Sequence, residues 1–187
     1  MILFHICDKI NKDSTTTKRR QFTINKKSNY LTLINAIDNL LASEHYEISI
    51  LANASALINE YIKNINWVGF YILKNHFLIL GPFQGKIACN PIRVGSGVCG
   101  KCVEKKETII VGNVHKFEGH IPCDEATNSE IVIPLFIDNN IYGVLDLDSK
   151  TFNRFSNVDQ RFLEQIAIII NRNLKRVKEN NPDIILI

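Results

Sequence analysis

The sequence has no uninterrupted apolar run near the roughly 18 residues that a membrane-spanning helix requires. Its short apolar start lacks the apolar core and small-residue cleavage site of a secretory signal. Internal repeats and low-complexity linkers are also absent. We therefore expect a cytoplasmic protein with no membrane partner, whose five cysteines serve metal binding, catalysis or core packing rather than structural disulfides.

The sequence also has little net charge, +3, and that charge is unevenly distributed. Residues 1–28 hold seven basic and two acidic side chains, which leaves 15 basic and 17 acidic side chains in the remainder. The remainder is thus mildly acidic, which argues against a nucleic-acid partner. The length fits one domain. We expect a disordered basic extension over residues 1–28, a catalytic domain over 29–180 and a tail over 181–187.

The hydrophobic periodicity predicts helices at the ends of the domain and strands in its middle. Helical spacing of apolar residues indicates helices over residues 30–41, 48–64 and 157–178. Runs of β-branched and aromatic residues indicate strands over residues 66–73, 76–81, 107–112, 130–137 and 141–149. A further short helix is expected after the glycines of "RVGSGVCGKC". This order is typical of an α+β domain with an antiparallel sheet.

The cysteines do not form the ligand pattern of a structural zinc site. Cys99 and Cys102 are separated by two residues, but no second pair accompanies them, and the alternating βαβ order of a thioredoxin-like protein is absent. We therefore expect no metal. Cys7 and Cys102 are interpreted as small buried residues. Cys89, Cys99 and Cys123 stand beside Gly, Pro, Asn or Asp, where function tends to reside, and we expect them to be accessible and reactive.

Six motifs, in a fixed order, resemble those of one enzyme family. They are "INWVGFYIL", "LGPFQGKIAC", "VGSGVCG", "VHKFEGHIPCD", "SEIVIPL" and "GVLDLDS". Between about Tyr30 and Leu174 the chain resembles the free methionine-(R)-sulfoxide reductases, which are built on a GAF domain. The resemblance implies a GAF-like fold with a central six-stranded antiparallel sheet flanked by helices, and a small buried pocket. It also implies reduction of the R epimer of free methionine sulfoxide, with no tightly bound cofactor and with thioredoxin as external reductant.

Sulfoxide reduction needs a thiolate that attacks sulfur, an acid that protonates the oxygen and a second thiol that resolves the sulfenic acid. The resemblance supplies Cys89, Cys99 and Cys123 as the thiols, and the acidic residues of the motifs are Glu130, Asp146 and Asp148.

Asp146 and Asp148 are two residues apart on a predicted strand, so they face the same side of the sheet. Like charges side by side repel unless a cation lies between them, and we expect this pair to hold the substrate ammonium group. Glu130 would protonate the sulfoxide oxygen, since unpaired burial raises the pKa of a carboxyl group. Trp67 and Tyr71 share a strand face and would enclose the substrate methyl group.

The sequence leaves the choice of nucleophile open. Cys99 follows glycines at a predicted helix start, where the helix dipole would favour a thiolate. Cys123 stands beside Asp124 and Glu125, which disfavour one. The resemblance nevertheless points to Cys123 as the nucleophile with Cys89 as the resolving thiol, and that is the assignment we expect.

GAF domains in general also bind small ligands for signalling. The alternative function is therefore a GAF-type small-ligand or redox sensor without catalysis, although we expect a stand-alone enzyme because no output domain follows the last long helix. That helix is also a candidate contact for a homodimer.

Overall fold

The computed structural model describes residues 26–180, which fold around one curled six-stranded sheet. Its strand order is β3-β2-β1-β6-β5-β4, and every neighbouring pair is antiparallel. The strands are β1 (Trp67–Lys74), β2 (Phe77–Gly85), β3 (Ile92–Arg93), β4 (Ile109–Val111), β5 (Ser129–Ile137) and β6 (Asn140–Ser149). This architecture confirms the α+β class and the six-stranded antiparallel sheet.

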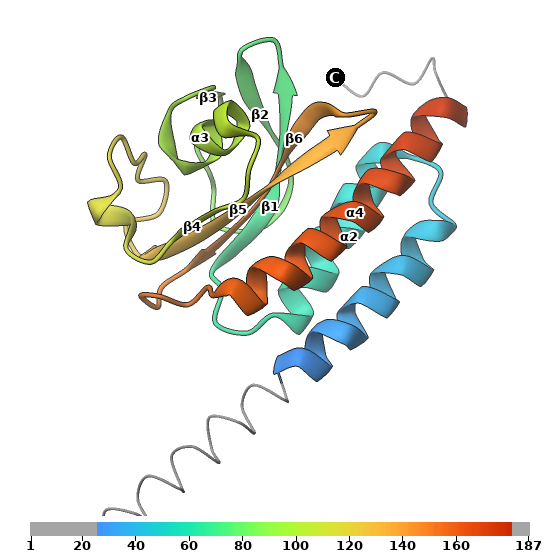
Figure 1. The fold of residues 1–187 in the computed structure, drawn as a ribbon, viewed down its shortest axis with the longest axis horizontal. Coiled ribbons are helices and arrows are strands. Elements are labelled where there is room, and N and C mark those ends of the chain that lie inside the picture. The colour runs from blue at the N-terminus through green and yellow to red at the C-terminus, as the bar shows by residue number, and fades with distance from the viewer. Residues whose placement is uncertain (1–25, 181–187) are drawn as a thin grey trace, which may run out of the picture.

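Helices cover the two faces of the sheet unequally (Figure 1). The larger hydrophobic core lies between one face and three long helices, namely a helix over residues 26–42, α2 (Glu47–Tyr61) and α4 (Asn157–Asn180). On the other face a smaller core packs under α3 (Gly97–Lys105). The 3-10 turn η1 (Val114–Lys116) comes after β4 in the chain. Among residues 26–180, no helix combines the length and hydropathy needed to cross a membrane.

Successive side chains along the central strands point to opposite faces of the sheet, which produces these two different sides. In β6, Leu145 and Leu147 are fully buried in the core beneath the long helices. Asp146 and Asp148 alternate with these leucines along the strand and therefore point to the face covered by α3. The predicted division of this strand into an apolar and an acidic side is confirmed.

A tight turn and a bulge together set the register of the β5–β6 hairpin. β5 ends at Ile137 and β6 begins at Asn140, so Asp138 and Asn139 form a two-residue loop, with φ angles of 50° and 62°. Positive φ at both positions is the signature of a type I′ turn, whose twist matches that of the flanking strands. The register then shifts by one residue between Leu135 and Phe136, and this shift places Glu130 directly opposite Asp148.

The structure differs from the sequence-based expectations in four places. β2 continues through Gly81-Pro82 to Gly85, where turn residues had suggested an end near residue 81. The two-residue strand β3 and the turn η1 are too short to produce a periodic signal. Residues 26–28, expected in the extension, are already helical. Cys7 and the rest of the expected extension, like the tail, lie outside the described residues.

Asp159 is the buried polar anchor of the helical layer. Its carboxylate accepts hydrogen bonds from the hydroxyl groups of Tyr30 and Ser156, at 2.7 Å each, and from the Ser156 backbone N–H at 2.8 Å. It also forms ion pairs with Lys26 at 2.6 Å and Arg154 at 3.0 Å. Burial alone would raise its pKa, but these donors outweigh burial and lower the pKa to about 2. The first helix, α4 and the loop after β6 are thereby joined.

We expect Asp159→Asn to lower the free energy of unfolding by about 2–4 kcal/mol at pH 7, because two cations lose a buried partner. A carboxylate with a depressed pKa stabilises the fold above its unfolded pKa. The difference between variant and wild type should therefore shrink as the pH falls from about 4 toward 2. Urea unfolding at several pH values measures it. Asp38→Asn, which breaks an exposed ion pair with Arg172, is the control and should cost less than about 1 kcal/mol. Equal losses in the two variants would contradict the assignment.

Candidate active site

A pocket opens on the α3 side of the sheet, and cross-strand pairing explains why its polar groups converge. Asp148 lies in the centre of a three-strand row, paired with Trp67 of β1 on one side and with Glu130 of β5 on the other. Directly paired residues of antiparallel strands share a face. Asp146 and Tyr71 follow on the same face, and all five of these predicted residues line the pocket.

Burial changes the acid strength of the three carboxyl groups. Glu130 is 7% exposed and Asp146 6% exposed. Desolvation raises the pKa of Asp146 to about 7. Desolvation and the neighbouring Asp146 raise the pKa values of Glu130 and Asp148 well above their usual range. Burial therefore favours the protonated form of these carboxyl groups, whereas a cation in the pocket would favour their charged form.

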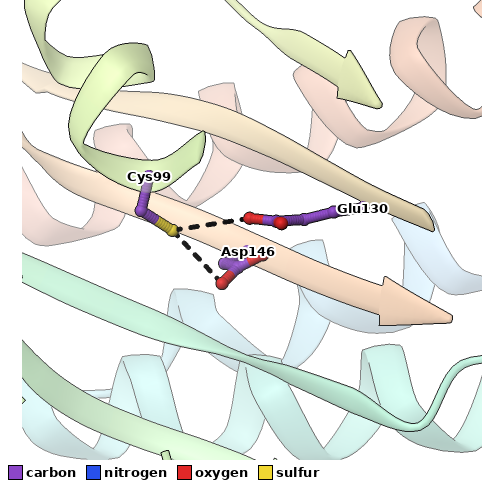
Figure 2. A group of neighbouring side chains, drawn as sticks. All are labelled: Cys99, Glu130 and Asp146. Carbon is purple, nitrogen blue, oxygen red and sulfur yellow. Dashed lines mark hydrogen bonds between the residues drawn. The ribbon is translucent and has the colours of Figure 1, made fainter. Parts of the chain in front are cut away.

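Cys99 lies deeper than its sequence context suggests. Its side chain extends from α3 toward the acids, with Sγ 3.2 Å from Asp146 Oδ2 and 4.0 Å from Glu130 Oε1 (Figure 2). The residue is 4% exposed, so the expectation that it is accessible is wrong. Desolvation and the two acids raise the pKa of its thiol, which outweighs the helix-dipole effect that would favour a thiolate. Cys102, in contrast, is buried as expected, with Sγ 3.7 Å from the Val132 carbonyl.

Cys89 and Cys123 are joined in a disulfide, with their Cα atoms 5.5 Å apart. They come from separate segments, one after β2 and the other after η1. Cys89 is half-buried, and Cys123 is exposed to solvent and lines the pocket. These two are thus the accessible cysteines among the described residues, and their disulfide lies beside the acids.

A polar network joins the same two segments and was not predicted from the sequence. Lys86 forms an ion pair with Asp124 at 3.2 Å, and Asn66 donates a hydrogen bond to the other Asp124 oxygen, also at 3.2 Å. Hydrogen bonding from the Ala126 backbone N–H, helped by Lys86 and Asn66, lowers the pKa of Asp124. The charge beside Cys123 therefore has partners, which weakens the sequence-based objection to a thiolate there. Lys86 and Asp124 are 38 positions apart in the sequence, so no local pattern predicts their contact.

The predicted aromatic pair forms one wall of the pocket. The rings of Trp67 and Tyr71 have centroids 5.9 Å apart, and Phe83 packs on Trp67 at 5.4 Å. A Cβ atom at Gly69 would come within 2.4 Å of the Trp67 ring, so glycine at this position leaves room for the indole to lie over β1. The Trp67 indole N–H donates to the Lys86 carbonyl at 3.0 Å, and the Tyr71 hydroxyl donates to the Cys89 carbonyl at 2.9 Å.

The acidic residues of the pocket favour binding of a cationic group. Asp146 Oδ1 is buried without a hydrogen-bond partner among the described residues. Of the described residues that line the pocket, none is Lys or Arg, and the pKa of the lining residue His120 is lowered by burial and by His115. A buried carboxylate without a partner is costly, so the site can accept an ammonium group or a metal ion beside Asp146.

Comparisons with known proteins agree with this geometry. Residues 50–172 match the GAF domain family. The free methionine-R-sulfoxide reductase of Escherichia coli (strain K12) is 49% identical over 144 residues, which are 77% of this chain and 87% of the relative. The protein of the same name from Saccharomyces cerevisiae is 40% identical over 177 residues, which are 90% of this chain and 94% of the relative.

The solved structures include similar chains as well. The free methionine-R-sulfoxide reductase from Neisseria meningitidis, in complex with its substrate, has a TM-score of 0.79 and 36% identity, covering 81% of this chain and 91% of that one. Sequence and fold thus agree over nearly the whole length of these relatives, and the resemblance carried by the six motifs is confirmed. This chain belongs to the free methionine-R-sulfoxide reductase family of GAF-domain proteins.

Proposed function

We propose that this protein reduces free L-methionine (R)-sulfoxide to L-methionine by thiol chemistry, with thioredoxin as the external reductant. The observation that carries the proposal is the disulfide between Cys89 and Cys123 beside a buried pocket lined by three carboxyl groups. Family membership supplies the substrate class, since relatives at 49% and 40% identity are named for this activity.

Substrate binding would use the charge and the shape of the pocket together. The Asp146 and Asp148 carboxylates would hold the α-ammonium group of a free amino acid, because its charge offsets their repulsion in a desolvated site. The Trp67 and Tyr71 rings would pack against the methyl group and side-chain methylenes. Glu130, with its raised pKa, would remain protonated and donate to the sulfoxide oxygen.

The redox step balances with two thiols. The Cys123 thiolate attacks the substrate sulfur, and the oxygen takes a proton. This OH group is then transferred to the Cys123 sulfur, as the substrate sulfur–oxygen bond and the bond between Cys123 and the substrate sulfur break. Methionine leaves, and Cys123 remains as a sulfenic acid. The Cys89 thiol then displaces water from that sulfenic acid and forms the disulfide. A thioredoxin dithiol returns the disulfide to two thiols and is itself oxidised. Each turnover therefore moves two electrons from thioredoxin to the sulfoxide.

Accessibility supports Cys123 over Cys99 as the nucleophile. Cys123 is exposed, lines the pocket and lies next to an aspartate whose charge is paired with Lys86. Cys99 faces two acids in a desolvated position, which disfavours its thiolate. We assign Cys99 to a secondary role, in which it relays the disulfide toward thioredoxin. A cytoplasmic location follows from this proposal, because reduced thioredoxin is maintained there. The homodimer remains a prediction.

The substrate prediction is tested by NADPH oxidation coupled through thioredoxin and its reductase. We expect turnover with free methionine (R)-sulfoxide, none with the S epimer, and a loss of at least about tenfold with the N-acetylated substrate. Acetylation removes the ammonium charge that the buried carboxylates require. Dithiothreitol in place of thioredoxin is the control. Turnover with dithiothreitol but not with thioredoxin would reject thioredoxin as the reductant and leave the proposed reaction supported. No turnover with either reductant would favour a sensor.

Asp146→Asn and Asp148→Asn should each lower kcat/KM for the free substrate by roughly ten- to a hundred-fold. The reason is the loss of a charge-assisted hydrogen bond, which is worth about 1.5–3 kcal/mol. Steady-state kinetics of both variants measure the effect. Asp138→Asn, in the β5–β6 turn, is the matched control and should be unchanged. Wild-type kinetics in both pocket variants would assign these residues to the fold alone.

Serine variants separate the roles of the cysteines in a single-turnover experiment without reductant. Cys123→Ser should release no methionine, because the attacking thiol is missing, whereas Cys89→Ser should release one methionine per enzyme and then stop as a sulfenic acid. Cys99→Ser should fall between these limits, and Cys102→Ser and Cys7→Ser should be nearly silent. Quantifying methionine by chromatography gives the result. A burst kept by Cys123→Ser and lost by Cys99→Ser would reverse the choice of nucleophile.

A further inference from the structure

One thiol and two carboxyl groups meet beneath α3. Cys99 Sγ and one carboxylate oxygen each from Glu130 and Asp146 lie within 4.8 Å of one another, and all three residues are buried. Figure 2 shows the three side chains converging from α3, β5 and β6 on one point. Convergence from three elements means that the sheet and the helix hold the donors in place without a ligand.

The spacing of these donors fits a tetrahedral metal ion. With metal–sulfur and metal–oxygen bonds of about 2.3 and 2.0 Å, ligand atoms of a tetrahedral zinc site lie about 3.5 Å apart. The observed sulfur–oxygen distances, 3.2 Å to Asp146 and 4.0 Å to Glu130, lie on either side of that value. Side-chain rotations that move the donor atoms by about half an ångström would bring both sulfur–oxygen distances to the tetrahedral value.

A second observation concerns an unpaired oxygen beside this cluster. Asp146 Oδ1 has no hydrogen-bond partner within residues 26–180, although the residue is only 6% exposed. In addition, the described pocket lining holds no Lys or Arg to offset the acids. A buried oxygen that lacks both a donor and a cation favours binding of a positively charged species. An ammonium group could pair with Asp146, but only a metal ion would also bind the Cys99 thiol.

We propose that Cys99, Glu130 and Asp146 form a binding site for a thiophilic divalent cation such as Zn²⁺, which competes with the substrate ammonium group. A thiolate ligand selects Zn²⁺ over Mg²⁺ and Ca²⁺, which prefer oxygen. Three protein ligands leave a fourth position on the pocket side, as in sites that hold an exchangeable water. The bound ion occupies the position that the substrate ammonium group would take, and it blocks the pocket. The competition with substrate rests on the proposed function, whereas the metal site itself does not.

Cobalt(II) tests the site directly, because Zn²⁺ has no spectrum of its own. We expect the full chain, with the Cys89–Cys123 disulfide intact, to bind Co²⁺ with a near-ultraviolet thiolate-to-cobalt band that Zn²⁺ abolishes. Cys99→Ser should weaken binding by at least about 100-fold, since loss of a group that merely supports a ligand already costs 10–100-fold. Glu130→Gln should weaken it as well.

Matched controls come from residues near the site that do not line the pocket. Cys102→Ser changes a thiol on the same helix that points to the Val132 carbonyl, and Glu125→Gln changes an exposed acid near Cys123. Both should bind Co²⁺ like wild type. Thermal unfolding of each variant checks that it is folded. A thiolate band that persists in Cys99→Ser, or no Co²⁺ binding by the folded wild type, would overturn the site.

Competition is measured in Cys123→Ser, which binds substrate without turning it over. Free methionine (R)-sulfoxide should displace Co²⁺ from this variant and remove the band, whereas N-acetylmethionine sulfoxide should not. Co²⁺ retained at saturating free substrate would refute the competition. Reductase activity without Co²⁺ binding would reject the metal site alone, and Co²⁺ binding without reductase activity would reject the proposed function alone.

Discussion

The arrangement of this domain depends on three carboxyl groups that share one buried face of the sheet, with no Lys or Arg among the described residues of the pocket lining. Register forces this proximity, because Glu130 and Asp148 are direct neighbours across β5 and β6, and Asp146 follows on the same face. Like charges in a desolvated place must take up protons or bind a cation. Burial raises the pKa values of all three groups, which favours the first outcome in the free protein. Substrate recognition and metal binding, as proposed, are two forms of the second.

The cover of the pocket has a different physical basis from its floor. The floor is made of sheet residues whose positions follow from backbone pairing, whereas the cover consists of two irregular segments held by side-chain contacts. Their links are the Cys89–Cys123 disulfide and the Lys86–Asp124 ion pair. The ion pair does not involve the sulfur atoms, so we expect it to keep the two thiols near each other throughout the proposed cycle. An exposed ion pair is weak alone, and here Asn66 supports it from the start of β1.

Strand periodicity was sufficient to predict the floor of the site, and chain topology was needed for the rest. The two-residue spacing of Asp146 and Asp148, and the four-residue spacing of Trp67 and Tyr71, place each pair on one face, as the structure confirms. The burial of Cys99 could not be predicted locally, because it results from α3 packing on β5 and β6. β2 passed through a Gly-Pro pair that normally ends a strand. Sequence alone also gave no basis for pairing Cys89 with Cys123, which came from the family resemblance.

The aromatic wall has a consequence for how this enzyme family diversifies. The Trp67 and Tyr71 rings bound the pocket, while their polar ends hold the carbonyls of Lys86 and Cys89. In the proposed function, the side chains that would limit substrate size are therefore the same ones that hold the segment of the resolving thiol. A substitution that widens the pocket would also loosen the segment on which recycling depends. Substrate range and recycling rate would then change together at these two positions.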